Sequence, residues 1–208
     1  IMGSYGIGVG RLLACIVGLA VAAAVQARPA GPGLEAALSA LEQRSTEAAS
    51  DALLLMRGDA VLLQRPAAGG ERVTELMSVT KSVVAMAVGC LLHEGRLDSL
   101  DAPIHRWYPE WKQGRKQQIS LRMLMDHSSG LQNDPRAHAE IYPAPDGVQL
   151  ALAAELDSAP GERFAYNNKA TNLIAGVVER AAGEPLDALA QRCLFDPLGI
   201  ADIQWERD

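Results

Sequence analysis

The chain has few lysines, and nowhere does it carry a run of basic residues. Its 208 residues include fifteen arginines but only four lysines, and the formal net charge is −6. An acidic surface without a basic groove repels phosphate backbones and anionic headgroups. The composition therefore argues against nucleic acids and anionic membrane surfaces as partners.

Histidine and cysteine are also scarce, which limits metal and disulfide chemistry. The four histidines lack the close His, Cys or Asp spacing that a zinc site shows, so no metal site is expected. Cys15 lies near the start of the chain, and Cys90 and Cys193 lie in helix-like segments. Because spacing alone cannot pair the last two, buried unpaired thiols are the favoured interpretation and a disulfide is the alternative.

The chain also lacks an apolar run long enough to span a membrane. Leu12 to Val25 is apolar but holds about 14 residues, whereas a span needs about 20. Arg11 precedes this run and Val25-Gln26-Ala27 follows it, as in a secretory signal peptide over residues 1–27. Cys15 lies near the start of the run instead of ending it, so no stable membrane anchor is expected. We expect export to a periplasm or beyond.

Residues 28–208 are enough for one domain with a substantial core. A helix is predicted over residues 34–47. The short apolar runs 52–56 and 60–64 predict two strands of a hairpin, because Arg57-Gly58-Asp59 between them suits a turn. Cell adhesion through this triplet is a less favoured alternative. Two strands alone do not form a stable sheet, so their partners must come from elsewhere.

The rest of the chain is predicted to be almost purely helical. The expected helices cover residues 78–95, 120–126, 146–156, 169–182 and 185–194, and residues 133–145 are expected to form a long loop. Ser120 and Asp146 are suitable N-caps, and Gly95 and Gly183 are suitable C-terminal stops. Trp107, Tyr108 and Trp111 are interpreted as packing residues, with a substrate cleft as the alternative.

Ser78-Val79-Thr80-Lys81 places a hydroxyl and an amine one helical turn apart, at the head of an apolar helix. Apolar neighbours disfavour a charged lysine, so the pKa of Lys81 is expected to fall and the amine can act as a base. The helix N-terminus offers backbone N–H groups to an oxyanion. A serine nucleophile needs this arrangement. A capping serine followed by a surface lysine is the simpler alternative.

Tyr166-Asn167-Asn168 forms a second chemical motif after a turn at Pro160-Gly161. A tyrosine beside a lysine amine suits proton shuttling, because the cation favours the phenolate, which acts first as a base and then as an acid. Asn168 could hold a substrate amide or orient the lysine. The alternative for Tyr166 is a half-buried aromatic side chain with a satisfied hydroxyl.

Three stretches in this order resemble the serine β-lactamase-related family, and the resemblance covers residues 34–208. They are Ser78 to Lys81, then Leu124-Met125-Asp126-His127-Ser128-Ser129-Gly130-Leu131, then Pro160-Gly161-Glu162-Arg163 leading to Tyr166-Asn167-Asn168. The family groups class C β-lactamases, D-alanyl-D-alanine carboxypeptidases, related esterases and some amide hydrolases. The resemblance implies an α/β (α+β) fold of β-lactamase/transpeptidase type, with an antiparallel sheet flanked by helices and a mostly helical lobe.

The resemblance also implies roles for individual residues. Ser78 would be the acylated nucleophile, Lys81 its general-base partner and Tyr166 the proton shuttle. Asn168 would contact the substrate and the lysine, with Asn167 as the alternative if the register shifts by one residue.

Two further residues of the middle stretch are interpreted as structural. The resemblance implies that His127 packs and takes no catalytic part. Asp126 stands where relatives commonly carry threonine, which we interpret as a local change of cap.

One motif of the family has no counterpart here. Relatives carry a Lys- or His-x-Gly triplet on an edge strand, which supplies an oxyanion N–H, and no such triplet follows Tyr166. The resemblance implies that this chain is the N-terminal portion, with the C-terminal strands and final helix missing. Loss of one oxyanion donor costs about 10²–10³ in rate.

The predicted function is that of an exported serine hydrolase. It would use a Ser-Lys-Tyr acyl-enzyme mechanism on the carbonyl of a small-molecule ester, amide or β-lactam, without a cofactor. Esterase, β-lactamase and peptidase activities all stay open, with esterase favoured by the breadth of the family. A truncated, catalytically inactive remnant is the alternative function. The sequence carries no signal for an oligomeric state.

Overall fold

The computed structural model describes residues 32–66, 76–134, 136–201 and 203–205. The expected signal peptide over residues 1–27 and most of the loop after Pro66 lie outside the described residues. Among the described helices, none combines the length and apolarity needed to cross a membrane. The described chain divides into two compact units.

The first unit contains a helix and the predicted hairpin. Its elements are α2 (Pro32–Glu47), β1 (Leu53–Arg57) and β2 (Ala60–Arg65), and the two strands pair antiparallel. Gly58 has a φ of +59°, which a glycine adopts without strain, so the Arg-Gly-Asp triplet serves as the hairpin turn. Arg65 links β2 to α2, because its Nη2 donates a hydrogen bond of 2.7 Å to Ser45 Oγ.

The second unit, from Met77 to Leu194 with Trp205, is mostly helical, as predicted. Its helices are α3 (Thr80–His93), α4 (Leu121–Met125), α5 (Ala137–Glu140), α6 (Gly147–Ala153), α7 (Asn168–Ala182) and α8 (Leu186–Ala190). Short 3₁₀ turns are η1 (Met77–Val79), η2 (Ile104–Arg106), η3 (Pro109–Trp111) and η4 (Arg115–Gln118), and the π-helical turn η5 spans Gln191–Phe195.

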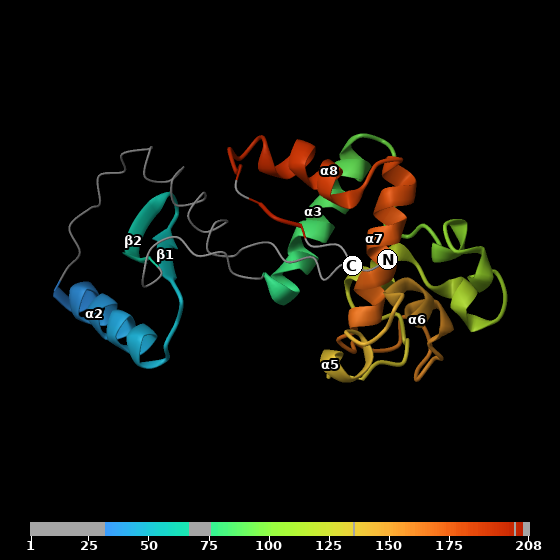
Figure 1. The fold of residues 1–208 in the computed structure, drawn as a ribbon, viewed down its shortest axis with the longest axis horizontal. Helices are drawn as coiled ribbons and strands as arrows, with labels where there is room; N and C mark the ends of the chain where they lie inside the picture. The colour runs from blue at the N-terminus through green and yellow to red at the C-terminus, as the bar shows by residue number, and fades with distance from the viewer. Residues whose placement is uncertain (1–31, 67–75, 135, 202, 206–208) are drawn as a thin grey trace. The chain divides into compact units, whose positions relative to one another are not determined.

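The α7 helix lies at the centre of this unit. It contacts α3, α4, α6 and α8 (Figure 1). Leu173, Val177 and Val178 are fully buried along α7, and Val88 and Leu91 are fully buried on α3. The apolar face of α7 therefore fixes the position of α3, which carries Ser78 at its head.

Most predicted helix ends are confirmed by their caps. The side chains of Ser120 and Asp146 accept hydrogen bonds from the first turns of α4 and α6, and Gly183 ends α7 with a φ of +65°. The α6 helix ends at Ala153, so the prediction of a helix to Leu156 is wrong. Leu156 instead forms an antiparallel bridge with Leu131. The predicted loop 133–145 contains the short helix α5.

The aromatic residues 107–111 pack, as the favoured interpretation predicts. Tyr108 and Trp111 are both fully buried in the core. Tyr108 Oη donates to the Leu173 carbonyl at 3.1 Å, and Trp111 Nε1 donates to the Leu152 carbonyl at 3.1 Å. Both polar tips are thus satisfied by helix carbonyls, as buried aromatic residues of these types require.

The favoured interpretation of two unpaired thiols is wrong. Cys90 and Cys193 form a disulfide, with Cα atoms 6.4 Å apart and a sequence separation of 103 residues. Spacing could not predict the bond, because it depends on how the second half of α3 lies against the turn that follows α8. The disulfide therefore closes most of the helical unit into one loop.

Reduction of this disulfide should destabilise the helical unit. A cross-link over roughly 100 residues lowers the entropy of the unfolded chain enough to stabilise the fold by about 4–5 kcal/mol in the chain-entropy model. We expect a lower denaturation midpoint for the reduced protein, and for a Cys90→Ala/Cys193→Ala variant without any reductant. Equal midpoints for the oxidised protein and the double variant would contradict the prediction.

Candidate active site

Ser78 and Lys81 lie close together at the start of α3. Ser78 is exposed and belongs to η1, the 3₁₀ turn before the helix, and not to the helix itself. Lys81 Nζ donates a hydrogen bond of 3.1 Å to Ser78 Oγ. Met77, immediately before the serine, has a φ of +47° in the left-handed region, which costs a non-glycine residue energy. The serine is thus presented on a tight turn beside an amine.

Tyr166 completes the group, although 88 residues separate it from Ser78. Its Oη lies 2.8 Å from Ser78 Oγ, and either oxygen can donate. Lys81 Nζ lies 5.1 Å from the centre of the tyrosine ring. The fold therefore brings three of the predicted site residues, Ser78, Lys81 and Tyr166, into one hydrogen-bonded cluster.

The environment of Tyr166 lowers the pKa of its phenol below the ordinary value. Partial burial raises this pKa, but hydrogen bonds from Lys81 and Ser78 and the charge of the lysine together outweigh it. Tyr166 is 44% exposed, so the residue is open to a substrate. A tyrosine in this state gives up its proton more readily than a free one and can return it later.

His127 supports the tyrosine from behind. Its ring lies 4.8 Å from the Tyr166 ring, centre to centre, and its Nδ1 accepts a hydrogen bond of 3.2 Å from the Asn167 N–H. Its carbonyl accepts from the Ala165 N–H at 2.8 Å. Burial, and then the charge of Lys81, lower the pKa of His127, which favours the neutral ring. A neutral ring that accepts at Nδ1 carries its proton on Nε2. These contacts orient Tyr166.

Gly130 and Asp126 explain the rest of the middle motif. Gly130 has a φ of +75°, and a Cβ there would lie 2.5 Å from the Ser158 carbonyl oxygen, so only glycine fits. The carbonyl of Ser128 accepts from the Gly161 N–H at 2.8 Å. Asp126 Oδ1 accepts from both the N–H and the hydroxyl of Ser128, which is the local cap expected of it. The motif thus holds the turn that leads to Tyr166.

The two asparagines after Tyr166 differ in their environment. Asn167 is buried and uses its side chain on the protein, since Nδ2 donates to the Leu131 carbonyl at 2.7 Å and Oδ1 caps α7 through Ala170. Asn168 is only partly buried and is the first residue of α7. Of the two, Asn168 is therefore the one suited to contact a ligand.

Asn133 is a site residue that the sequence analysis missed. Its Nδ2 donates to the Tyr166 carbonyl at 3.3 Å, and its Oδ1 accepts from the Asn168 N–H at 3.2 Å. It lies two residues after the middle motif in a segment predicted to be a loop. Nothing in its neighbours could have revealed the contact, which depends on the tertiary fold.

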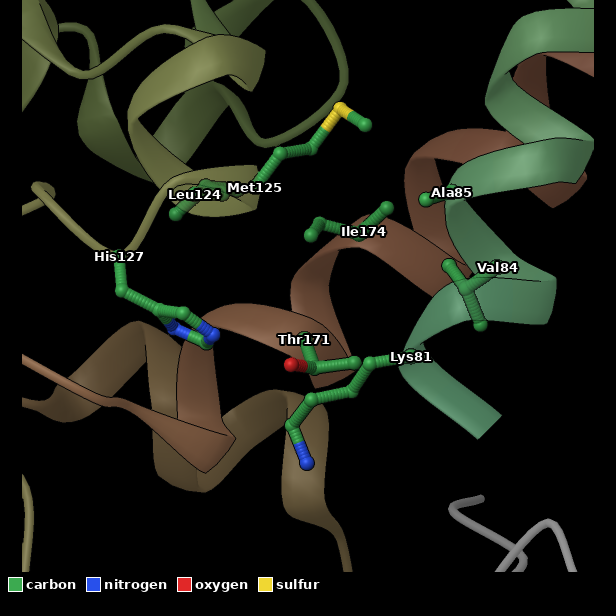
Figure 2. A pocket seen from close by; sticks show the side chains of 8 residues that line it. All are labelled: Lys81, Val84, Ala85, Leu124, Met125, His127, Thr171 and Ile174. Atoms are coloured by element: carbon green, nitrogen blue, oxygen red, sulfur yellow. The ribbon is translucent and has the colours of Figure 1, made fainter. Parts of the chain in front are cut away.

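A small pocket opens beside Lys81, between α3, α4 and α7 (Figure 2). Its lining residues are Lys81, Val84, Ala85, Leu124, Met125, His127, Thr171 and Ile174. Lys81, His127 and Thr171 supply the polar groups, and the other five side chains are apolar. No three His, Cys, Asp or Glu side chains within the described ranges gather as a metal site would require.

The lysine should control the ionisation of Tyr166. In a Lys81→Met variant the cation and its hydrogen bond are lost, so the pKa of Tyr166 should rise toward the free value of about 10. A pH titration of tyrosinate absorbance, with Tyr166→Phe subtracted, measures this value. The tyrosine should ionise at lower pH in the parent than in the variant, and coincident titration curves would contradict the assignment.

Three known proteins with different activities are similar in sequence to this chain. They are esterase EstB of Burkholderia gladioli, 35% identical over 61% of this chain, and the 6-aminohexanoate-dimer hydrolase of Paenarthrobacter ureafaciens, 30% identical over 76%. The third is the D-alanyl-D-alanine-carboxypeptidase/endopeptidase AmpH of Escherichia coli, 28% identical over 65%. The matches span 37%, 46% and 37% of those proteins, so the chain spans less than half their length.

Solved structures show the same fold. A Bacteroides dorei protein described as a candidate beta-lactamase matches 79% of this chain and 51% of its own, with a TM-score of 0.65 and 26% identity. A penicillin-binding protein homologue from Pyrococcus abyssi matches 80% of this chain and 42% of its own, with a TM-score of 0.61 and 23% identity. The fold is therefore α+β and β-lactamase/transpeptidase-like, as predicted.

The family model described as Beta-lactamase matches residues 22–208, which include all three motifs. The relatives named above are hydrolases. The chain thus belongs to the beta-lactamase family, the serine β-lactamase-related group of hydrolases.

Proposed function

We propose that this chain carries the acylation centre of an exported serine hydrolase that acts on ester, amide or β-lactam carbonyls. One observation carries the proposal: Ser78 Oγ lies within hydrogen-bonding distance of both Lys81 Nζ and Tyr166 Oη. A serine is activated when its hydroxyl contacts a base and a nearby cation stabilises the anionic form of that base.

In the proposed first step, the Ser78 oxygen attacks the carbonyl carbon of the substrate while its proton passes to the Tyr166 phenolate. Lys81 stabilises the phenolate before the transfer and orients the serine hydroxyl. The tetrahedral oxyanion is held by backbone N–H groups at the start of α3. Tyr166 then returns the proton to the leaving oxygen or nitrogen, the bond to that atom breaks, and an acyl ester on Ser78 remains.

Water completes the cycle in the second step. Tyr166 takes a proton from the water, whose oxygen attacks the acyl ester, and Ser78 recovers its proton as the acid leaves. Asn168, at the start of α7, is placed to contact the substrate beside Tyr166. No cofactor takes part in these steps.

An ester is the substrate class to test first. The named activities of the relatives (an esterase, an amide-dimer hydrolase and a carboxypeptidase/endopeptidase) share acyl transfer at a carbonyl. The esterase shows 35% identity to this chain. The small pocket beside Lys81 is lined mainly by apolar side chains, which suits an uncharged substrate group.

Ser78→Ala should abolish covalent labelling by a fluorophosphonate, because this probe reacts with an activated serine. Ser82→Ala is the matched control, since Ser82 is an exposed serine in the first turn of α3, four residues after Ser78. Intact mass spectrometry should find one adduct in the parent and in Ser82→Ala, and none in Ser78→Ala. Labelling that persists without Ser78 would refute the nucleophile, and an unlabelled parent would favour an inactive chain.

Export is tested separately from catalysis. When the sequence is expressed in a bacterium with a periplasm, the proposed signal over residues 1–27 should be removed after Ala27. N-terminal sequencing of the periplasmic fraction should then begin at Arg28. Retention of the protein in the cytoplasm with residues 1–27 intact would contradict this part of the proposal.

A further inference from the structure

Lys169 is a buried lysine three residues after Tyr166. The residue is 2% exposed, on the first turn of α7, and its Nζ forms an ion pair with Glu140 Oε1. In Figure 1 the short helix α5, which ends at Glu140, lies beside the first turn of α7. A buried ammonium group is costly unless it is paired, so this lysine depends on its partner.

Glu140 connects the ion pair to the segment that contacts Tyr166. The carboxylate of Glu140 holds Lys169 with one oxygen and accepts the Asp134 N–H with the other, at 3.1 Å. Asn133, the residue before Asp134, contacts the main chain on both sides of Asn167, at the Tyr166 carbonyl and the Asn168 N–H. A continuous set of contacts thus runs from Lys169 through Glu140, Asp134 and Asn133 back to Tyr166.

This circuit closes around the start of α7. The Asn167 side chain caps α7 and also donates to the Leu131 carbonyl. Segment 131–134 therefore lies alongside residues 166–168. The Lys169–Glu140 pair is the one contact of this circuit that joins α5 to α7 through two charged side chains. Its loss would leave α5 free to move and would loosen the hold of Asn133 on the tyrosine.

We propose that Lys169 and Glu140 are positioning residues for Tyr166: their buried ion pair holds segment 131–134 against residues 166–168 and so sets the tyrosine hydroxyl against Ser78. The proposal rests on the proposed function, in which Tyr166 moves the proton. Neither residue touches the reacting atoms. The simpler alternative is an ion pair that contributes to stability alone.

Single and double variants separate these two roles. Glu140→Gln keeps an acceptor for the Asp134 N–H but leaves the Lys169 ammonium buried without a counter-ion, so the melting temperature should fall. In Glu140→Gln/Lys169→Met the unpaired charge is gone, and the melting temperature should return close to the parent value, because replacing both members of a buried pair is often neutral.

The acylation rate of this double variant should stay low even though its melting temperature recovers. We expect the fluorophosphonate labelling rate of the double variant to stay about 10- to 100-fold below the parent rate, the cost of a misplaced reacting group. Tyrosinate absorbance should place the pKa of Tyr166 above its parent value, because the contacts with Ser78 and Lys81 are weakened. A double variant with the parent labelling rate and the parent tyrosine titration would overturn the proposal.

Asn133→Ala tests the route of the effect. If the ion pair acts through Asn133, this variant should slow labelling by a similar factor, and adding it to the double variant should slow labelling little further. Fully multiplicative losses would overturn the proposed route. Arg106→Gln is the control, because it removes the exposed Arg106–Asp98 ion pair outside the circuit and should leave labelling unchanged.

Failure of the proposed function would have a different signature. If the parent is not labelled at Ser78 at all, the proposed hydrolase activity fails. The tyrosine titration still reads the position of Tyr166 in that case. Unchanged titrations in the double variant and in Asn133→Ala would then overturn the positioning role as well.

Discussion

The packing of α7 against α3 is the constraint on which the rest of this structure depends. Ser78 lies just before Val79, the N-cap of α3, and Tyr166 just before Asn167, the N-cap of α7. Two rigid helices with buried apolar faces thus bring the two hydroxyls to 2.8 Å although their chain positions are far apart. Rigid elements hold reacting groups to tighter tolerances than loops alone, which explains why the site is built at two helix starts.

The far end of α3 is fixed as firmly as the end that carries the site. Cys90 is bonded to Cys193, and Arg192 forms ion pairs with Glu94, just after α3, and with Glu184. These ion pairs are largely exposed and contribute little to stability individually. Together with the disulfide they connect α3 to the segment around α8, so the helix that carries Lys81 is constrained along its whole length.

The Lys81 ammonium group acts on both aromatic rings of the site. The Lys81 ammonium group lowers the pKa of Tyr166 and also that of His127, where burial has the larger effect. The phenol of Tyr166 therefore ionises more readily than a free one, and the lowered pKa of His127 favours its neutral ring. The similar proteins are named as an esterase, a 6-aminohexanoate-dimer hydrolase and a carboxypeptidase/endopeptidase, and the proposed acyl transfer through Tyr166 would suit all three.

Local patterns in the sequence determined the main helices other than α5 and the end of α6, the hairpin turn at Gly58 and the caps Ser120 and Asp146, because these depend on neighbours in the chain. The motifs also pointed to Ser78, Lys81 and Tyr166, because the hydroxyl, the amine and the phenol each belong to a particular residue type. Only the tertiary structure decided that Cys90 meets Cys193, that Asn133 holds Tyr166 and that Lys169 pairs with Glu140. These contacts join distant segments, and their free energies depend on burial and orientation that no local spacing records.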